Sequence, residues 1–324
     1  MTNIFTGIEI TKKYINYFMA DSSYRIKGVH KTALPFHIPA DKFIDEVENG
    51  FREAIRKTEI PAERIASISI SVPAAIDHKN GSIIYSAELP QLQGLPLKDE
   101  LGARLKKLII LDTEANVRTF IEHKLGSAVR YSNFIFIVLD SWISAGVYIN
   151  NSLLRSKRGI AHELGHTIVE PHGRKCGCSQ RGCLEEYVSF DAVVRYYLKH
   201  RRGSARNTMT VYDLFRLAGT SDFAAINAFE KMGNYLGLAL INMVNIVKPD
   251  AVIFAGDFSR ALNFFLPSIK STLDTRSYYG SSGNITYRKS DLGTNALREG
   301  LVHLAKDSYT NAYNLKVCDD LFII

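Results

Sequence analysis

Hydrophobic residues recur along the chain in short runs that predict β-strands. Residues 3–10 (NIFTGIEI), 13–19 (KYINYFM) and 66–72 (ASISISV) have strand-like spacing. The runs NFIFIVLD at 133–140 and AVIFAG at 251–256 are continuously apolar, which is typical of strands buried on both faces. We expect a hairpin to lead from the first of these runs into AGVYINN at 145–151.

Between these strands the apolar residues change to helical spacing. The segment 39–58 places Phe43, Ile44, Val47, Phe51 and Ile55 on one helical face. Similar patterns predict helices at 115–124, 189–201 and 222–248, with further helix and strand to about residue 306. Strands mixed with crossover helices in two successive blocks predict two α/β lobes, with a boundary near residues 124–132.

Composition places the chain among ordinary globular proteins. It has 324 residues, of which 46% are hydrophobic and 23% charged. No stretch has the length and apolarity of a membrane span, and the start TNIFTGIEI lacks a signal-peptide pattern, so we expect a cytoplasmic protein. The net charge of +7 is spread out; its densest cluster, KHRRGSAR at 199–206, is interpreted as a solvated helix end, with a functional basic patch as the alternative.

Three of the four cysteines fall within eight residues, inside HELGHTIVEPHGRKCGCSQRGCLEEY at 162–187. A cysteine cluster beside histidines in a reducing compartment is typical of zinc, which takes four thiolate or imidazole ligands in a tetrahedron. We therefore predict a zinc site at Cys176, Cys178 and Cys183. Its fourth ligand would be His162, His166 or His172, and three free thiols without a metal are the alternative.

The same segment resembles the ROK family (repressors, open reading frames and kinases). ELGH at 163–166 is similar to the family's ExGH sugar motif, and CGCSQRGCLE at 176–185 is similar to its CxCGxxGCLE zinc loop. The resemblance covers nearly the whole chain, and further similar segments are SVPAAIDHKNG (71–81), LPQLQGLPL (89–97), VNIVKPDAVIFAGDFS (244–259) and LGTNALREG (292–300).

This resemblance implies an α/β fold of the actin-like, hexokinase type, with two ribonuclease H-like lobes and a zinc-clasped loop. We expect an N-terminal lobe at 1–125 and a C-terminal lobe with the zinc loop at 126–300. A C-terminal helix and tail at 301–324 would return toward the first lobe. Residues 209–229 have spacing similar to a helix-turn-helix, but their place in the family pattern predicts a structural helix pair.

The resemblance also implies residue roles. His166, Cys176, Cys178 and Cys183 would hold a structural Zn²⁺, because four protein ligands leave no position open for water. Glu163, His166 and Glu185 would bind the hydroxyl groups of a sugar.

Two phosphate-binding loops of the family are altered. Its DxGGT loop aligns with EITKK at 9–13, and its GTGIGxG loop aligns with DSWISAG at 140–146, so Asp140, Trp142 and Ser144 replace glycines. Glycine lets main-chain N–H groups approach a phosphate, whereas a side chain blocks the approach and a carboxylate repels it by on the order of 1 kcal/mol. These substitutions argue against ATP and Mg²⁺ as cofactors.

The segment that supplies the family's general base is also altered. The NDxN motif aligns with Thr113, Glu114, Ala115 and Asn116. Glutamate is one methylene longer than aspartate, and a displacement of about 1 Å can lower a rate roughly a hundredfold, so Glu114 is expected to be a weak base. Glu88 replaces the asparagine of a PNLP loop, and it favours a ligand with an amino group or an extra donor. The expected sugar-binding residues are Glu88, Thr113, Glu114, Glu163, His166 and Glu185.

Three functions fit these residues. The glycine losses favour a sugar sensor or regulator that has lost phosphoryl transfer. The alternatives are an ATP-dependent hexose or N-acetylhexosamine kinase that uses Glu114 as its base, and an assembly partner with a vestigial cleft. A homodimer is expected from the resemblance. Repressors of the family carry an N-terminal helix-turn-helix, whereas this chain begins almost directly on its first strand, so DNA contact is expected only through an absent or separate module.

Overall fold

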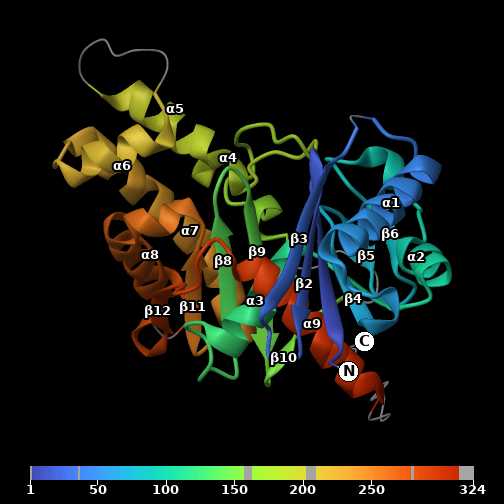
Figure 1. The fold of residues 1–324 in the computed structure, drawn as a ribbon. Coiled ribbons are helices and arrows are strands. Elements are labelled where there is room, and N and C mark those ends of the chain that lie inside the picture. The colour runs from blue at the N-terminus through green and yellow to red at the C-terminus, as the bar shows by residue number, and fades with distance from the viewer. Residues whose placement is uncertain (1, 36, 157–162, 202–208, 279–280, 314–324) are drawn as a thin grey trace. The chain divides into compact units, whose positions relative to one another are not determined.

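Two five-stranded sheets with equivalent strand orders organise the chain (Figure 1). The computed structural model describes residues 2–35, 37–156, 163–201, 209–278 and 281–313. Unit 1 comprises Met1–Lys124, Arg155–Ala161 and Leu292–Ile324, and unit 2 comprises Leu125–Leu154 and His162–Asp291.

The sheet of unit 1 has the order β3-β2-β1-β4-β7. Strands β1 (Ile4–Ile10), β2 (Tyr14–Asp21) and β3 (Ile26–Ala33) are antiparallel. Strands β4 (Ile65–Ser71) and β7 (Leu108–Asp112) continue the sheet in parallel with β1. The other elements of unit 1 are α1 (Ala40–Thr58), η1 (Ala62–Arg64), β5 (Ala75–Asp77), β6 (Ser82–Tyr85), η2 (Pro90–Leu92), α2 (Leu97–Leu105), α3 (Glu114–Leu125) and α9 (Ala296–Tyr313).

The side chains of strand β4 contact helices on both faces of the sheet. Ile68 and Ile70 are buried in the core that also contains the apolar face of α1. On the alternate positions, Ser67 and Ser69 donate hydrogen bonds to the main-chain oxygens of Ala305 and Leu301 in α9, at 2.8 and 2.5 Å. The small serine side chains therefore let α9 pack closely on β4, and their buried hydroxyl groups are hydrogen-bonded.

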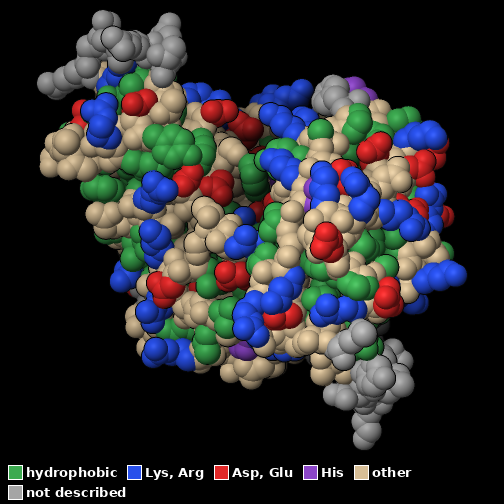
Figure 2. All heavy atoms as spheres, viewed as in Figure 1, with side chains coloured by type: hydrophobic (Ala, Val, Ile, Leu, Met, Phe, Trp, Pro, Cys, Tyr) green, Lys and Arg blue, Asp and Glu red, His purple; other side chains and the backbone are tan. Residues whose placement is uncertain are grey.

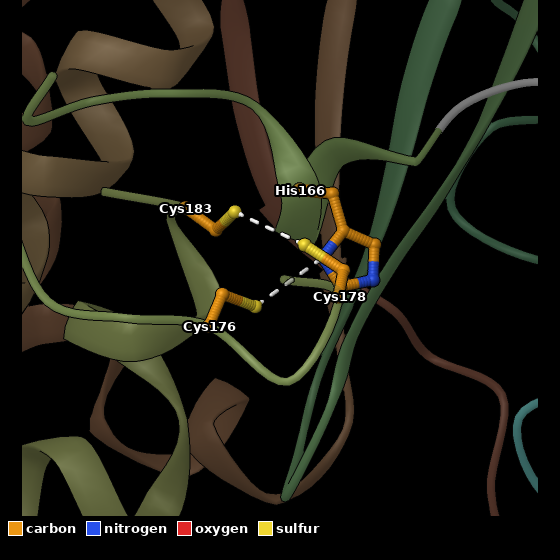
Figure 3. A group of neighbouring side chains, drawn as sticks. All are labelled: His166, Cys176, Cys178 and Cys183. Carbon is orange, nitrogen blue, oxygen red and sulfur yellow. Dashed lines mark hydrogen bonds between the residues drawn. The ribbon is translucent and has the colours of Figure 1, made fainter. Parts of the chain in front are cut away.

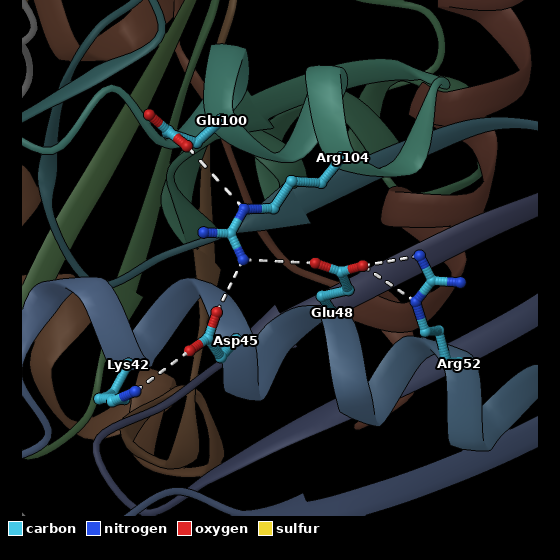
Figure 4. Close-up of polar contacts among 6 residues, drawn as sticks. All are labelled: Lys42, Asp45, Glu48, Arg52, Glu100 and Arg104. Atoms are coloured by element: carbon cyan, nitrogen blue, oxygen red, sulfur yellow. Dashed lines mark hydrogen bonds and ion pairs between the residues drawn. The ribbon is translucent and has the colours of Figure 1, made fainter.

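Helices α1 and α2 are joined by ion pairs at the surface (Figure 4). Arg104 of α2 contacts Asp45 at 2.7 Å and Glu48 at 3.4 Å, and Arg52 contacts the same Glu48 at 2.7 Å. Because these groups are partly exposed, we expect a small and salt-sensitive contribution to stability.

The sheet of unit 2 has the order β10-β9-β8-β11-β12. Strands β8 (Phe134–Leu139), β9 (Ile143–Ile149) and β10 (Ser152–Leu153) are antiparallel, and β11 (Ala251–Ala255) and β12 (Thr286–Lys289) run parallel to β8. The strand order and directions repeat those of unit 1. The helical elements of unit 2 are η3 (Leu164–His166), α4 (Glu185–Val188), α5 (Phe190–His200), α6 (Val211–Gly219), α7 (Phe223–Val247), η4 (Asp257–Ala261), α8 (Leu262–Arg276) and η5 (Ser281–Asn284).

The helices of unit 2 share one core. Leu214 of α6, Phe229 of α7 and Phe265 of α8 are all fully buried in it. Helices α6 and α7 therefore pack as a structural pair, as the sequence predicted for residues 209–229.

The long apolar patterns gave the correct elements. Strands were predicted at 3–10, 13–19, 66–72, 133–140 and 251–256, and strands occupy each of these segments. The predicted helices at 39–58, 115–124, 189–201 and 222–248 are likewise confirmed. Strand β3 was not predicted, because IKGVHKTA at the sheet edge has one buried residue and no apolar alternation.

Lys and Arg side chains are interspersed with Asp and Glu over the face seen in Figure 2, in keeping with a dispersed net charge of +7. Within the described ranges, no helix combines the length and the apolarity needed to span a bilayer. Residues 202–206 of the predicted basic cluster, His162 and Cys318 lie outside the described residues.

Candidate functional site

Four side chains of residue types that can ligate a metal come together in unit 2 (Figure 3). The ligand atoms of His166, Cys176, Cys178 and Cys183 all lie within 4.8 Å of one another. The Sγ atoms of Cys178 and Cys183 are 3.6 Å apart, and Nδ1 of His166 is 3.7 Å from Sγ of Cys176. A tetrahedral ion with metal–sulfur bonds of about 2.3 Å places two sulfurs about 3.8 Å apart, so the cluster could hold a metal ion.

The loop that carries the cysteines is held by main-chain contacts. Cys183 forms an isolated bridge with Ile168, and Lys175 forms one with Arg181. Gly182 has φ +77, and an added Cβ would lie 1.7 Å from the oxygen of Glu170, so only glycine fits. These main-chain contacts therefore hold the loop in the conformation that brings the cysteine side chains together.

Among the three histidines left open by the sequence, His166 joins the cluster and exposed His172 does not. Burial raises the pKa of the Cys176 and Cys183 thiols, whereas the N–H of Gln180 lowers the pKa of the Cys178 thiol. A cation at the centre would favour the thiolate form of all three cysteines.

Glu163 and Glu185 lie beside this loop. The main-chain oxygen of Glu163 accepts a hydrogen bond from the N–H of His166 at 3.0 Å, where η3 begins. Oε2 of the Glu185 side chain accepts one from the N–H of Ile143 at 3.2 Å. Desolvation raises the pKa of Glu163, and the Glu185 carboxylate raises it further against the effect of His166. An added Cβ at Gly165 would lie 2.8 Å from the oxygen of Ile143, so the glycine lets η3 approach β9. The effect of Glu185 on the pKa of Glu163 links the two carboxylates electrostatically.

Thr113 and Glu114 lie in unit 1 where β7 leads into α3. Oγ1 of Thr113 accepts the N–H of Asn116 at 3.2 Å and thereby caps α3. Nε of Arg118 donates to Oε1 of Glu114 at 2.7 Å. The carboxylate of Glu114, which was predicted to be a weak base, is therefore ion-paired with the guanidinium of Arg118 one helical turn away. Glu88 is exposed on the loop between β6 and η2.

The turn after β1 satisfies its own amides. Oγ1 of Thr11 accepts the N–H groups of Lys13 and Tyr14 at 3.3 and 3.1 Å, and it donates to the oxygen of Tyr14. At the end of β1, Glu9 accepts a hydrogen bond from Asn16 at 2.7 Å. The N–H groups of Lys13 and Tyr14 are therefore engaged within the turn, and the N–H of Thr11 donates to the main-chain oxygen of Tyr14.

The turn after β8 carries a second internal contact. Oδ1 of Asp140 accepts the N–H of Asp257 at 2.6 Å, where η4 begins beside Gly256. Oδ2 of Asp257 accepts a hydrogen bond from the hydroxyl of Tyr212 at 2.5 Å, and Trp142 is 50% exposed in the same turn as Asp140. The Asp140 carboxylate thus caps the first amide of η4.

Sequence reasoning missed a buried carboxylate in unit 1, that of Asp112. Asp112, at the end of β7, accepts from Asn116 at 2.7 Å and from Nε of Arg155 at 2.9 Å, and His78 lies 3.8 Å away. Burial lowers the pKa of His78, while Asp112 opposes this change. Through its hydrogen bonds with Arg155 and Asn116, Asp112 holds Arg155 and the first turn of α3 at the end of β7. Arg118 was missed too, although its spacing of four from Glu114 is the signal for an ion pair on a helix.

Solved structures share this fold over nearly the whole chain. A ROK family transcriptional regulator, described as a homolog of the E. coli MLC protein, superposes with a TM-score of 0.84 at 19% identity, covering 94% of this chain and 78% of that one. A ROK family glucokinase from Streptomyces griseus, solved with glucose and AMPPNP, gives 0.71 at 23% identity and covers 95% of this chain and 100% of that one. The fold is therefore the actin-like fold of the sugar kinases.

The sequence matches the ROK family over residues 5–308, and the chain belongs to this family. The xylose repressor of Bacillus subtilis is 27% identical over 308 residues, which are 94% of this chain and 77% of the repressor. The xylose repressor of Bacillus spizizenii is 30% identical over 91% of this chain and 75% of that protein. The glucokinase of Thermotoga maritima is 31% identical over 66% of this chain and 73% of that enzyme. Relatives of both kinds, repressors and kinases, thus share this sequence pattern.

Proposed function

We propose that this chain binds a sugar without transferring phosphate to it, and acts as the sugar-responsive part of a regulator-like protein. The observation that carries the non-catalytic part is the Asp140 carboxylate on the N–H of Asp257, at 2.6 Å. This contact supports the proposal because a phosphate brought to this turn would meet a negative charge and an amide that is already hydrogen-bonded.

Two contacts in unit 1 support the same proposal. Thr11 occupies the amides of the turn after β1. Arg118 holds the Glu114 carboxylate, so a sugar hydroxyl would have to compete with a guanidinium for the only base predicted from the sequence.

Sugar recognition is proposed for Glu163, His166 and Glu185 in unit 2 and for Glu88, Thr113 and Glu114 in unit 1. Ionised carboxylates accept charge-assisted hydrogen bonds from ring hydroxyls. We propose Zn²⁺ as the ion at His166, Cys176, Cys178 and Cys183, because three thiolates and one imidazole form a donor set that suits zinc. The ion would be structural, and it would hold the loop that positions His166 beside Glu163.

The remaining features follow from the regulator-like proposal. The protein would work in the cytoplasm as a homodimer. An ATP-dependent sugar kinase that uses Glu114 as its base is the second candidate, and the glucokinase relatives favour it.

A binding panel tests the sugar proposal. D-xylose and D-glucose, chosen from what the relatives are named for, are titrated calorimetrically into the purified chain together with N-acetyl-D-mannosamine, an N-acetylhexosamine. We expect one of them to bind, and Glu163→Gln and Glu185→Gln each to weaken it about 10- to 100-fold, since a hydrogen bond to a charged group contributes about 1.5–3 kcal/mol. The exposed Glu230→Gln change on α7 serves as the control. Unchanged affinity in both site variants would exclude these residues from sugar binding.

A further inference from the structure

A cavity of about 420 Å³ opens in unit 2 against helices α5 and α7 and the metal-binding loop. Its floor is apolar, and the residues that form it are Ala192, Val193, Ala228 and Met232, all of them buried. The volume suits one small molecule, since ligand cavities are typically about 300–1,000 Å³.

Four permanent cations line the same cavity, namely Arg174, Arg195, Lys199 and Lys231. No Asp or Glu belongs to the lining among the described residues. Within that part of the chain, the one ion pair these four cations form is Arg195 with Glu186, at 3.6 Å. A cavity with this excess of positive charge attracts an anion.

The two arginines are positioned by the backbone of α4. Nη1 of Arg174 donates to the oxygen of Glu186 at 2.6 Å, and Nη2 of Arg195 donates to the same oxygen at 3.3 Å. The guanidinium of Arg174 also lies over the ring of Tyr187, at 4.9 Å from its centroid. Guanidinium groups held in this way present donors in a fixed fork, which matches the geometry of a phosphate.

Aromatic side chains form the walls. The rings of Tyr187 and Tyr235 are 4.3 Å apart, and those of Tyr196 and His200 are 4.1 Å apart. Nζ of Lys231 lies 5.0 Å from the centroid of Tyr235. Aromatic walls above an apolar floor favour a ring-shaped body, while the cations favour a charged end.

We propose that this cavity binds a phosphorylated small molecule, with its phosphate on the arginines and lysines and its ring against the tyrosines. The shared chemistry is a phosphate monoester on a ring, which a sugar phosphate and a nucleotide both offer. Helix α4 joins this cavity to the proposed sugar site, since Glu185 and Glu186 are its first two residues. The phosphate site goes beyond the proposed sugar-binding function and does not depend on it.

Calorimetric titration of the full chain tests the proposal. The probes are glucose 6-phosphate and AMP, with glucose, adenosine and inorganic phosphate as comparisons. We expect one of the two esters to bind at least 10-fold more tightly than its unphosphorylated counterpart and than inorganic phosphate, and the ester that does so identifies the source. The combined Lys199→Ala and Lys231→Ala variant should lose at least 10-fold in that affinity.

Lys270→Ala provides a matched control, because Nζ of Lys270 lies over the ring of Tyr287 at 5.4 Å, much as Lys231 lies over Tyr235. Circular dichroism checks that each variant is folded, and Arg195→Ala gives a second test if the double variant is not. Absence of ester binding below 1 mM, binding that survives these changes, or equal loss in Lys270→Ala would each overturn the proposal.

Discussion

Nε of Arg118 donates to the carboxylate of Glu114 at 2.7 Å, one turn along α3. The pair also acts on Glu9 at the end of β1. Burial raises the pKa of Glu9, the hydrogen bond from Asn16 lowers it, Glu114 raises it and Arg118 lowers it. Arg118 therefore acts on two carboxylates, that of Glu9 at the end of β1 and that of Glu114 at the start of α3.

Replacing Arg118 with Ala should raise the pKa of Glu9 further, because its lowering effect is lost. Loss of the ion pair should reduce the free energy of unfolding by about 0.3–0.5 kcal/mol, the usual contribution at this helical spacing. Carbon NMR of the Glu9 carboxyl group against pH measures the change, with exposed Arg56→Ala as control. An unchanged titration of Glu9 in Arg118→Ala would show that the pair does not reach β1.

Removing the metal should loosen the cysteine loop. We expect about one zinc per chain by elemental analysis, and a fall in Tm of about 5 °C or more on chelation. Cys178→Ser should reproduce the effect, while the neighbouring Ser179→Ala should keep both metal and Tm. A chelated protein with the same Tm and the same hydrogen exchange in residues 163–186 would contradict the predicted structural role.

The contact between Arg155 and Asp112 should be worth more than a surface ion pair. The side chain of Asp112 is 2% exposed, and Arg155 contacts it at 2.8 Å. Arg155→Ala leaves a buried carboxylate without its cation, so we expect a loss of about 2–4 kcal/mol in urea unfolding. Arg25→Ala is the matched control because that side chain is 75% exposed. Equal effects of the two changes would show that the Arg155 contact adds nothing beyond the surface pair.

His303 should make stability depend on pH. Its ring stacks on Tyr24 with centroids 3.5 Å apart, and burial lowers the pKa of His303 to about 4, with Asp307 opposing and Lys306 and Lys124 assisting the shift. The unfolded chain, in which a histidine titrates near 6.5, binds this proton first as pH falls. Stability should therefore be lost between about pH 6.5 and 4, by about 1–3 kcal/mol.

His303→Phe should flatten that part of the pH profile, measured as the urea midpoint from pH 7 to 4.5. His200→Phe, at an exposed position at the end of α5, serves as the control. A profile in His303→Phe as steep as in the natural chain would assign the pH dependence to other groups.

The strands and helices with long apolar patterns could be predicted from the sequence because burial itself produces the pattern. Phe134–Leu139 is buried at every position, and a continuous apolar run is typical of a strand that is covered on both faces. The grouping of the three cysteines could be predicted because Cys176, Cys178 and Cys183 are near in sequence, and a short loop has few ways to arrange them.

Contacts between distant segments could not be predicted in this way. The pairing of Asp140 with Asp257 and that of Asp112 with Arg155 depend on strand order, which no local pattern encodes. The cationic cavity had only a partial signal. Lys199 and His200 belong to a basic cluster interpreted as a solvated helix end, and Arg174 and Lys231 reach the same cavity only through the fold.

The most direct test of sugar binding without phosphoryl transfer is calorimetric titration of the best-binding sugar into the chain in the presence of saturating ATP and Mg²⁺. We predict a finite binding curve with the same affinity as without ATP and a signal that returns to baseline after every injection. A sustained heat of turnover after each injection, accompanied by release of ADP, would show that the chain is a working kinase.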